Sequence, residues 1–175
     1  MGSSYPHVPV KLVIGFIYRE ESVYRDILRS LVIKFGPLDY ESGAIEFTHT
    51  RYYETELGAP LTRRFVSFKK TIPPEKLVDI KLLTNRLEVT TSYNGARRIN
   101  IDPGYVDLAK FILATTKNYR HRIYLTRGIF AEVTLYYRGK TYTAGECTYP
   151  DYRTPEYIGI FNKIRSTYAQ QITPR

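Results

Sequence analysis

The sequence contains no tryptophan, one methionine and a single cysteine, Cys147. One cysteine cannot build an internal disulfide framework, so a disulfide-stabilised scaffold is excluded. No apolar run approaches the roughly 18 residues that a membrane-spanning helix needs, because the longest, residues 12–17, contains a glycine and is followed by Tyr18-Arg19. Residues 1–4 lack the basic start and the apolar stretch of a signal peptide. These absences predict a soluble cytoplasmic protein with no membrane partner.

Acidic residues are also few: 17 Asp and Glu stand against 26 Lys and Arg in 175 residues, which gives a formal net charge of +9. Hydrophobic residues make up 43% of the chain, and 17 Tyr and 8 Phe are among them. This content is enough to bury a core and excludes a disordered chain. We therefore expect one domain, residues 1–175, with residues 1–8 flexible. A basic chain rich in tyrosine suggests a nucleic-acid or nucleotide partner.

The first hundred residues alternate between strand and helix patterns. Residues 10–18 form a near-continuous apolar run, which predicts a buried strand, and residues 20–35 follow helical spacing until Gly36-Pro37. Further strands are expected over residues 38–48, with an interruption at Ser42-Gly43, over 63–72 and over 97–101. A helix is expected from Pro73-Pro74 to about residue 87 or 89. Its buried positions are expected at Leu77, Ile80 and Leu83 or Leu87. This order is that of the split βαβ unit of ferredoxin-like domains.

The second half begins with Asp102-Pro103, which is typical of a helix N-terminus and predicts a third helix over residues 102–113. Two β-hairpins follow. In the first, a loop at residues 126–128 sets Ile123 opposite Ala131 and Tyr124 opposite Phe130, with the inward positions expected at Ile123, Leu125, Ile129, Ala131, Val133 and Leu135. The second turns at residues 138–139, and a closing helix starts at Thr154-Pro155. The expected fold class is α+β, a ferredoxin-like βαββαβ unit extended by a helix, two C-terminal β-hairpins and a closing helix.

Known nucleotide and metal motifs are missing. Gly139-Lys140-Thr141 has the end of a P-loop, but the glycine required five positions earlier is Thr134, and the context is a hairpin. Thr116-Lys117-Asn118 lacks the order that reads guanine. His7, His49, His121 and Cys147 show no ligand spacing, so no zinc site is expected. The sequence identifies no cofactor.

The Asp102-Pro103-Gly104-Tyr105 segment has two interpretations. It is an ordinary helix opening, or Gly104 lets an anionic ligand approach the helix N-terminus, where free N–H groups favour negative charge.

The outward face of the first hairpin likewise has two interpretations. This face, with Arg120, Arg122, Tyr124, Phe130, Glu132, Thr134 and Tyr136, resembles a platform for single-stranded RNA. Alternatively, another element covers this face and Arg122–Glu132 is a partly buried ion pair.

Several blocks of the sequence are similar to one prokaryotic family, known as domain of unknown function 4416. They are residues 9–15 (PVKLVIG), 58–68 (GAPLTRRFVSF), 97–116 (RRINIDPGYVDLAKFILATT), 121–125 (HRIYL), 128–135 (GIFAEVTL) and 148–157 (TYPDYRTPEY). The resemblance covers residues 9–172. Its members are often labelled GTP-binding proteins, a label that the motifs above do not support. The resemblance implies membership of this family but no particular reaction.

The leading functional hypothesis is binding of a phosphate-bearing ligand, a nucleotide or RNA, between the hairpin face and the Asp102 turn. The residues expected to bind it are Arg64, Arg98, Gly104, Tyr105, Lys110, Lys117, Arg122, Tyr124, Tyr152 and Arg153. A rival hypothesis is an enzyme acting on a small phosphorylated substrate, with catalytic Asp102, His121 and Glu132. A third is a protein-interaction module, in which a homo-oligomer would bury the tyrosine face. A closed pocket holding the three catalytic candidates would favour the enzyme, and an open basic face the binder.

Overall fold

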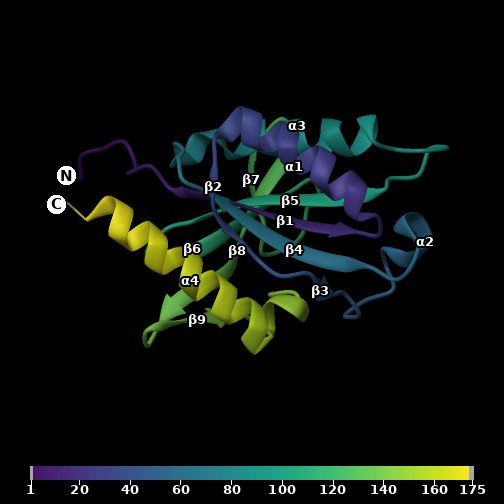
Figure 1. The fold of residues 1–175 in the computed structure, drawn as a ribbon. Coiled ribbons are helices and arrows are strands. Elements are labelled where there is room, and N and C mark those ends of the chain that lie inside the picture. Colours follow the sequence, from purple (N-terminus) through teal and green to yellow (C-terminus); the bar gives the residue numbers. More distant parts are fainter. Residues whose placement is uncertain (1, 174–175) are drawn as a thin grey trace.

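One antiparallel sheet runs through the protein and carries helices on both faces (Figure 1). The structure is a computed structural model that describes residues 2–173. Within this range the sheet has nine strands, in the main order β2-β4-β1-β5-β6-β8-β7, with β3 beside β4 and β9 beside β8. The protein is therefore a mixed α and β structure, as the sequence predicts.

The N-terminal half contains all of the elements expected up to residue 90, and a short helix α2 in addition. In chain order they are β1 (Lys11–Tyr18), α1 (Glu21–Phe35), β2 (Leu38–Glu41), β3 (Ile45–Glu46), α2 (Glu54–Leu57), β4 (Thr62–Phe68) and α3 (Leu77–Thr90). Strands β4 and β5 flank β1 on either side. Helices α1 and α3 lie together on one face of the sheet (Figure 1).

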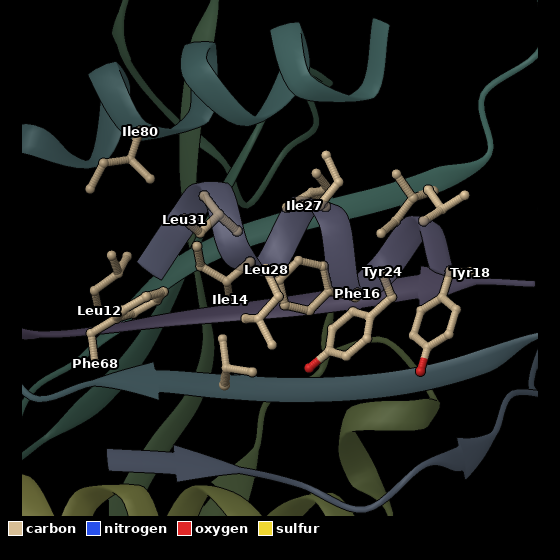
Figure 2. Close-up of a cluster of buried hydrophobic side chains, with 14 of the residues drawn as sticks. Leu12, Ile14, Phe16, Tyr18, Tyr24, Ile27, Leu28, Leu31, Phe68 and Ile80 are labelled. Carbon is tan, nitrogen blue, oxygen red and sulfur yellow. The ribbon is translucent and has the colours of Figure 1, made fainter. Parts of the chain in front are cut away.

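The larger core lies between these two helices and the sheet. Leu12, Ile14 and Phe16 alternate along β1 toward α1, and Figure 2 shows Ile27 and Leu31 among the helix residues that meet them. The rings of Tyr18 and Tyr24 stack with centroids 4.8 Å apart. Burial of one such side chain contributes roughly 1.5–3 kcal/mol, so this cluster is what holds α1 on the sheet.

The helix predicted over residues 102–113 is absent, and the segment instead forms the hairpin of β5 (Ile99–Val106) and β6 (Lys110–Thr115). Ile99 and Ile101 face α1 and α3, whereas Val106 packs on the opposite face. This alternation of buried side chains outweighs the local helix-start signal of Asp102-Pro103, because each face of β5 has its own core to fill.

Gly104 is therefore not a helix residue that opens a path to a ligand, as one interpretation held. It lies in the middle of β5, where a Cβ atom would stand 2.3 Å from the carbonyl oxygen of Ile112 and 2.7 Å from the ring of Phe111. The glycine lets the backbones of β5 and β6 come together. Its role is packing within the sheet.

Both C-terminal hairpins are present, formed by β7 (Ile123–Thr126), β8 (Ile129–Arg138) and β9 (Thr141–Ala144). The predicted pairs Ile123–Ala131 and Tyr124–Phe130 are confirmed, but the predicted loop at residues 126–128 is one residue too long, because Thr126 belongs to β7 and pairs with Ile129 after a register shift. The second turn falls at Gly139-Lys140, both with positive φ, one residue later than predicted.

The predicted inward face of the first hairpin is only partly right, because Ile129 and Leu135 are buried as expected but belong to different core clusters. Ile123 is 69% exposed, because β7 is the last strand of the sheet and no helix covers it. A register shift between β6 and β8 also exchanges the faces along β8. Val133 is consequently half exposed, while Glu132 and Thr134, expected on the outer face, are buried.

Helix α4 (Pro155–Ile172) covers the face of the sheet opposite α1 and α3 (Figure 1). It starts where predicted, with the Thr154 hydroxyl accepting the Tyr157 N–H at 3.3 Å. Phe161 and Tyr168 of α4 pack in one cluster with Phe65 and Phe111 of the sheet. No helix within residues 2–173 has the length and apolar content needed to cross a membrane.

Candidate functional site

A large cavity lies where strands β5 and β6 separate. The two strands pair only from Gly104 to Val106 on β5, so residues 99–103 of β5 diverge from the end of β6. The cavity has a volume of about 730 Å³, within the range of roughly 300–1,000 Å³ that is usual for small-molecule sites. Residues of α3, from one face of the sheet, and residues 149–152, from the other, both line it. The cavity therefore passes through the split in the sheet.

Side chains of α3 replace the missing strand partner along this edge of β5. A Glu88 carboxylate oxygen accepts the Ile101 N–H at 2.6 Å, and Lys81 Nζ donates to the Ile101 carbonyl at 3.0 Å. Pro103, just before the β5–β6 pairing begins, has no N–H to offer. Because the backbone of Ile101 is satisfied without β6, the split between the strands is a stable part of the fold.

Arg63 is the most deeply buried charge at the cavity, with 1% of its surface exposed. One Nη lies 3.4 Å from Asp102 Oδ2 and the other 3.9 Å from Asp151 Oδ2. The second Nη also donates to the Tyr152 hydroxyl. Burial works against the Arg63 charge, yet Tyr152 and the two carboxylates leave its pKa raised. Arg63 is thus a fixed cation that orients the acidic groups around it.

Asp102 is the most exposed of the four carboxylates lining the cavity. Its side chain is 25% exposed, against 7% for Glu88, 2% for Glu132 and 10% for Asp151. Asn100 Nδ2 donates to Asp102 Oδ2 at 2.8 Å, on the same oxygen that faces Arg63. Within residues 2–173 no hydrogen bond reaches Oδ1, and Lys81 Nζ stands 3.9 Å from it. Oδ1 is therefore an acceptor available to a ligand.

The rim of the cavity has a different charge from its interior. Its exposed residues include Lys117, at the end of β6, and Tyr52, whose hydroxyl accepts from Lys117 Nζ at 3.1 Å. That hydrogen bond lowers the pKa of Tyr52. In the described part of the chain, no carboxylate lies within 4 Å of Lys117, which distinguishes it from Arg63, Lys81 and Arg97. The rim thus offers a cation without an acidic partner, next to the hydroxyl of Thr116.

Glu132 connects the cavity to the hairpin. One of its oxygens accepts from Arg122 Nε at 2.7 Å and lies 3.1 Å from His121 Nε2. Arg122 also donates to the Tyr149 hydroxyl at 2.5 Å, which ties the segment over the cavity to β8. The Arg122–Glu132 ion pair of the alternative interpretation is therefore present and buried. The hairpin face itself is not covered by another element, because Tyr124 is 58% and Tyr136 37% exposed.

The structure brings together four of the residues predicted to form a site. Asp102, Glu132, Lys117 and Tyr152 all line the cavity. His121 contacts Glu132 but lines a separate hollow of about 290 Å³, which also includes Cys147. Arg122 does not line the cavity but donates hydrogen bonds to three residues that do, Glu132, Tyr149 and the backbone carbonyl of Lys117.

The other predicted ligand residues are engaged elsewhere. Arg64 binds Tyr18, Glu41 and the Ser42 carbonyl on the α1 side of the sheet, and Arg98 binds Glu20. Lys110 pairs with Asp107 at the β5–β6 turn. The remainder lie in the core or away from the cavity: Gly104 and Tyr105 on β5, Tyr124 on the exposed edge strand β7, and Arg153, which donates to the carbonyls of residues 145, 146 and 148. The single site expected between the hairpin face and the Asp102 turn is thus divided.

Sequence reasoning missed the contribution of α3. Its buried side chains include Lys81, Thr84 and Glu88, whereas the predicted core positions Leu83 and Leu87 are only partly buried. Lys81 and Glu88 are seven residues apart and share one helical stripe with Leu77. The sequence signal that could have revealed this contribution is the presence of a lysine and a glutamate on the same helical stripe as the buried Leu77.

The carboxylates of the cavity are matched by cations and do not form a metal site. Glu88 faces Arg97, Glu132 faces Arg122, and Asp102 faces Arg63. Within residues 2–173 no group of three or more His, Cys, Asp or Glu side chains is arranged to hold a metal ion.

Comparison with known proteins gives one finding. No curated protein and no solved structure matches the chain at a significant level. The pattern of one protein family matches residues 8–168, nearly the whole chain and every element that forms the cavity. The chain belongs to the family described as Domain of unknown function (DUF4416).

Proposed function

We propose that the cavity at the β5–β6 split binds a small phosphate-bearing ligand, of the size of a nucleotide or a sugar phosphate, with the phosphate at the rim beside Lys117. The observation that carries this proposal is the charge polarity of the cavity. The rim presents Lys117 with no carboxylate partner in the described chain, and the interior presents the free oxygen of Asp102. A ligand with an anionic end and a hydrogen-bond-donating end fits this arrangement.

The pKa shifts of the tyrosines around the cavity differ between its rim and its interior. At the rim, Lys117 lowers the pKa of Tyr52. Farther in, burial raises the pKa of Tyr53 and the charge of Asp102 raises it further. Burial likewise raises the pKa of Tyr149, with the charge of Glu132 adding to it. Burial is the largest cause at both inner tyrosines, and Arg63 and Arg122 oppose the effect of the carboxylates there. Only at the rim does a cation set the direction of the shift, which favours an anion at that position.

An open RNA platform has less support. Four of the basic side chains expected to neutralise phosphate are bound to carboxylates: Arg64 to Glu41, Arg98 to Glu20, Lys110 to Asp107 and Arg122 to Glu132. Tyr124, expected to stack with a base, lies on β7, separated from β5 in the sheet order by β6 and β8. A phosphate contact there would have to displace an existing ion pair.

The cavity also contains one group that the rival hypothesis, an enzyme, could use as a base. Asp102 is held by Asn100 and Arg63 through Oδ2, so Oδ1 is oriented and free to take a proton from a bound substrate. We infer that Asp102 is the general base if the bound ligand reacts. Glu132, held by Arg122 and His121, would position Tyr149 at the other side of the cavity.

We infer in addition that the N-terminal part is a split βαβ unit of the ferredoxin-like type. The support is the antiparallel order β2-β4-β1-β5, with α1 and α3 on one face. In this arrangement the split that forms the cavity lies just outside the fourth strand of the unit, where the additional β6 leaves it.

The experiment that tests the proposed function is a titration of the protein with inorganic phosphate, adenosine monophosphate and ribose 5-phosphate, followed by melting temperature and by calorimetry. We expect at least one organic phosphate to raise the melting temperature by linkage, with an affinity that falls with added salt. Lys117→Ala should weaken binding by about 10-fold or more, whereas Lys70→Ala, an exposed lysine outside the cavity, should leave it unchanged. Equal binding by the two variants would overturn the proposed function.

A further inference from the structure

The inner end of the cavity contains a donor and an acceptor that face each other without touching. Lys81 Nζ and Asp102 Oδ1 are 3.9 Å apart, which is too far for a direct hydrogen bond. Both groups are held from outside. Lys81 Nζ is fixed by the Ile101 carbonyl at 3.0 Å, and Asp102 is fixed through its other oxygen by Asn100 and Arg63. These hydrogen bonds hold the two groups at this separation, close enough to attract each other as an ion pair.

The gap fits a single oxygen atom. An oxygen placed at about 2.8 Å from each group would bridge the 3.9 Å between them. An ammonium group has three N–H donors, and the hydrogen bond to Ile101 uses one, so Lys81 keeps donors for such an oxygen. The bridging group must accept from Lys81 and donate to Asp102 at the same time.

Only a hydroxyl group meets both requirements among the common ligand functions. A carbonyl or phosphate oxygen accepts from Lys81 but would face the Asp102 carboxylate with a lone pair. A protonated amine donates to Asp102 but would face the positive charge of Lys81. A carbon in place of the oxygen would keep water from Asp102 Oδ1 and from the free donors of Lys81 without offering either a hydrogen bond, which is costly.

We propose that a sugar hydroxyl of the ligand binds between Lys81 Nζ and Asp102 Oδ1, so that the site selects hydroxylated phosphates, such as sugar phosphates and ribonucleotides, over their deoxy counterparts. This inference rests on the proposed function and goes beyond it, because it assigns the inner end of the ligand. Tyr53 and Tyr149, which also line the cavity, supply ring surface along the path from Lys117 at the rim.

The test compares matched ligand pairs on the intact protein. Ribose 5-phosphate is compared with 2-deoxyribose 5-phosphate, and adenosine monophosphate with its 2′-deoxy and 3′-deoxy forms, by calorimetry. We expect the hydroxylated member of at least one pair to bind at least 10-fold more tightly. This comparison uses the wild-type protein alone, because a site built around a hydroxyl group binds the deoxy analogue more weakly.

Two variants locate the effect. In Asp102→Asn the amide oxygen takes the place of Oδ2, where Asn100 and Arg63 donate, and the amide N–H₂ then faces Lys81. The acceptor becomes a donor, so the preference for the hydroxylated ligand should fall below 3-fold, and Lys81→Met should reduce it similarly. The matched control is Asp26→Asn on the exposed face of α1, which should keep the wild-type preference. Circular dichroism melting confirms that each variant is folded.

The outcomes separate the two proposals. Equal affinity for hydroxylated and deoxy phosphates, with binding still dependent on Lys117, overturns the hydroxyl site and leaves the phosphate site in place. A preference that Asp102→Asn and Asp26→Asn retain equally also overturns it. Absence of binding by every member of the panel overturns both.

Discussion

Arg63 and Asp102 form an ion pair across an intervening strand. Arg63 lies on β4 and Asp102 on β5, and both strands flank β1, where Gly15 pairs with Asp102 and with Phe65. A Cβ on Gly15 would stand 3.3 Å from an Arg63 Nη and 3.1 Å from the ring of Phe65. The glycine thus gives the guanidinium a path over β1 to the carboxylate that lines the cavity.

The first prediction concerns Arg63. Arg63→Met should lower the free energy of unfolding by about 3 kcal/mol or more, because removing one partner leaves a buried carboxylate without compensation. Asp151, with 10% of its side chain exposed, is the group most affected. Urea denaturation measures the change, with the exposed Lys70→Met as control. A difference between the two variants below about 0.5 kcal/mol, the usual size of a surface effect, would contradict this account of the cluster.

A second prediction compares two glycines. Gly104→Ala should destabilise the protein by about 1–3 kcal/mol, because its Cβ would lie 2.3 Å from the Ile112 carbonyl and the two strands would have to move apart. Gly159→Ala, in the middle of α4 with no atom near the added methyl, should stabilise it by about 0.5–1 kcal/mol. Chemical denaturation measures the change in the free energy of unfolding, which should be a decrease for Gly104→Ala and an increase for Gly159→Ala. The assignment of residues 99–106 to a strand fails if the two substitutions have the same effect.

The third prediction uses the pH dependence of Glu88. Burial raises the pKa of Glu88 above its ordinary value of 4.5, so the folded protein holds this proton more tightly than the unfolded chain does. The contribution of Glu88 to stability is therefore greatest at pH values below 4.5 and decreases as the pH rises through the folded-state pKa. Glu88→Gln removes this titration.

The measurement is the difference in unfolding free energy between the wild type and Glu88→Gln, followed from pH 4 to pH 8. The wild type should lose stability relative to the variant as the pH rises. Glu56→Gln is the control with the opposite sign, because hydrogen bonding from Arg97 lowers the pKa of Glu56. A difference for Glu88 that grows in favour of the wild type would show that burial does not raise the pKa of Glu88 in the folded protein.

A fourth prediction addresses the Arg122–Glu132 pair. The 2.7 Å contact joins side chains that are 7% and 2% exposed, so the two residues should be coupled energetically. A double-mutant cycle with Arg122→Met and Glu132→Gln should give a coupling free energy of about 1–3 kcal/mol. The exposed pair Arg120–Glu146 provides a comparison, and its coupling should be close to zero. Similar values for the two pairs would mean that Glu132 is not buried as described.

The limits of sequence reasoning are clearest at residues 102–113. Asp102-Pro103 satisfies the local rules for a helix start, and only the apolar alternation of Ile99, Ile101 and Val106 pointed to a strand. By contrast, the opening of α4 at Thr154-Pro155 was predicted correctly. The local signal and the tertiary environment agree there, since α4 buries one stripe and has a single face to satisfy.

The candidate site shows the same division. Asp102, Glu132, Lys117 and Tyr152 were identified from residue type and neighbourhood, and the structure places all four around one cavity. Arg64 and Arg98 were equally plausible on charge alone. Their acidic partners, Glu41 and Glu20, are far away in the sequence, so the ion pairs that engage them are visible only in three dimensions.

The sequence by itself determined the mixed α and β class, the positions of α1, α3 and α4, and the shortage of acidic residues that first suggested a phosphate ligand. Each of these follows from local periodicity, capping or composition. Only the tertiary structure decided that β5 and β6 separate, that Lys81 and Glu88 take over the edge between them, and that Arg64, Arg98, Lys110 and Arg122 are each paired with a carboxylate. These features depend on which distant segments pack together, because burial and pairing, rather than residue type, decide whether a charged side chain is free to meet a ligand.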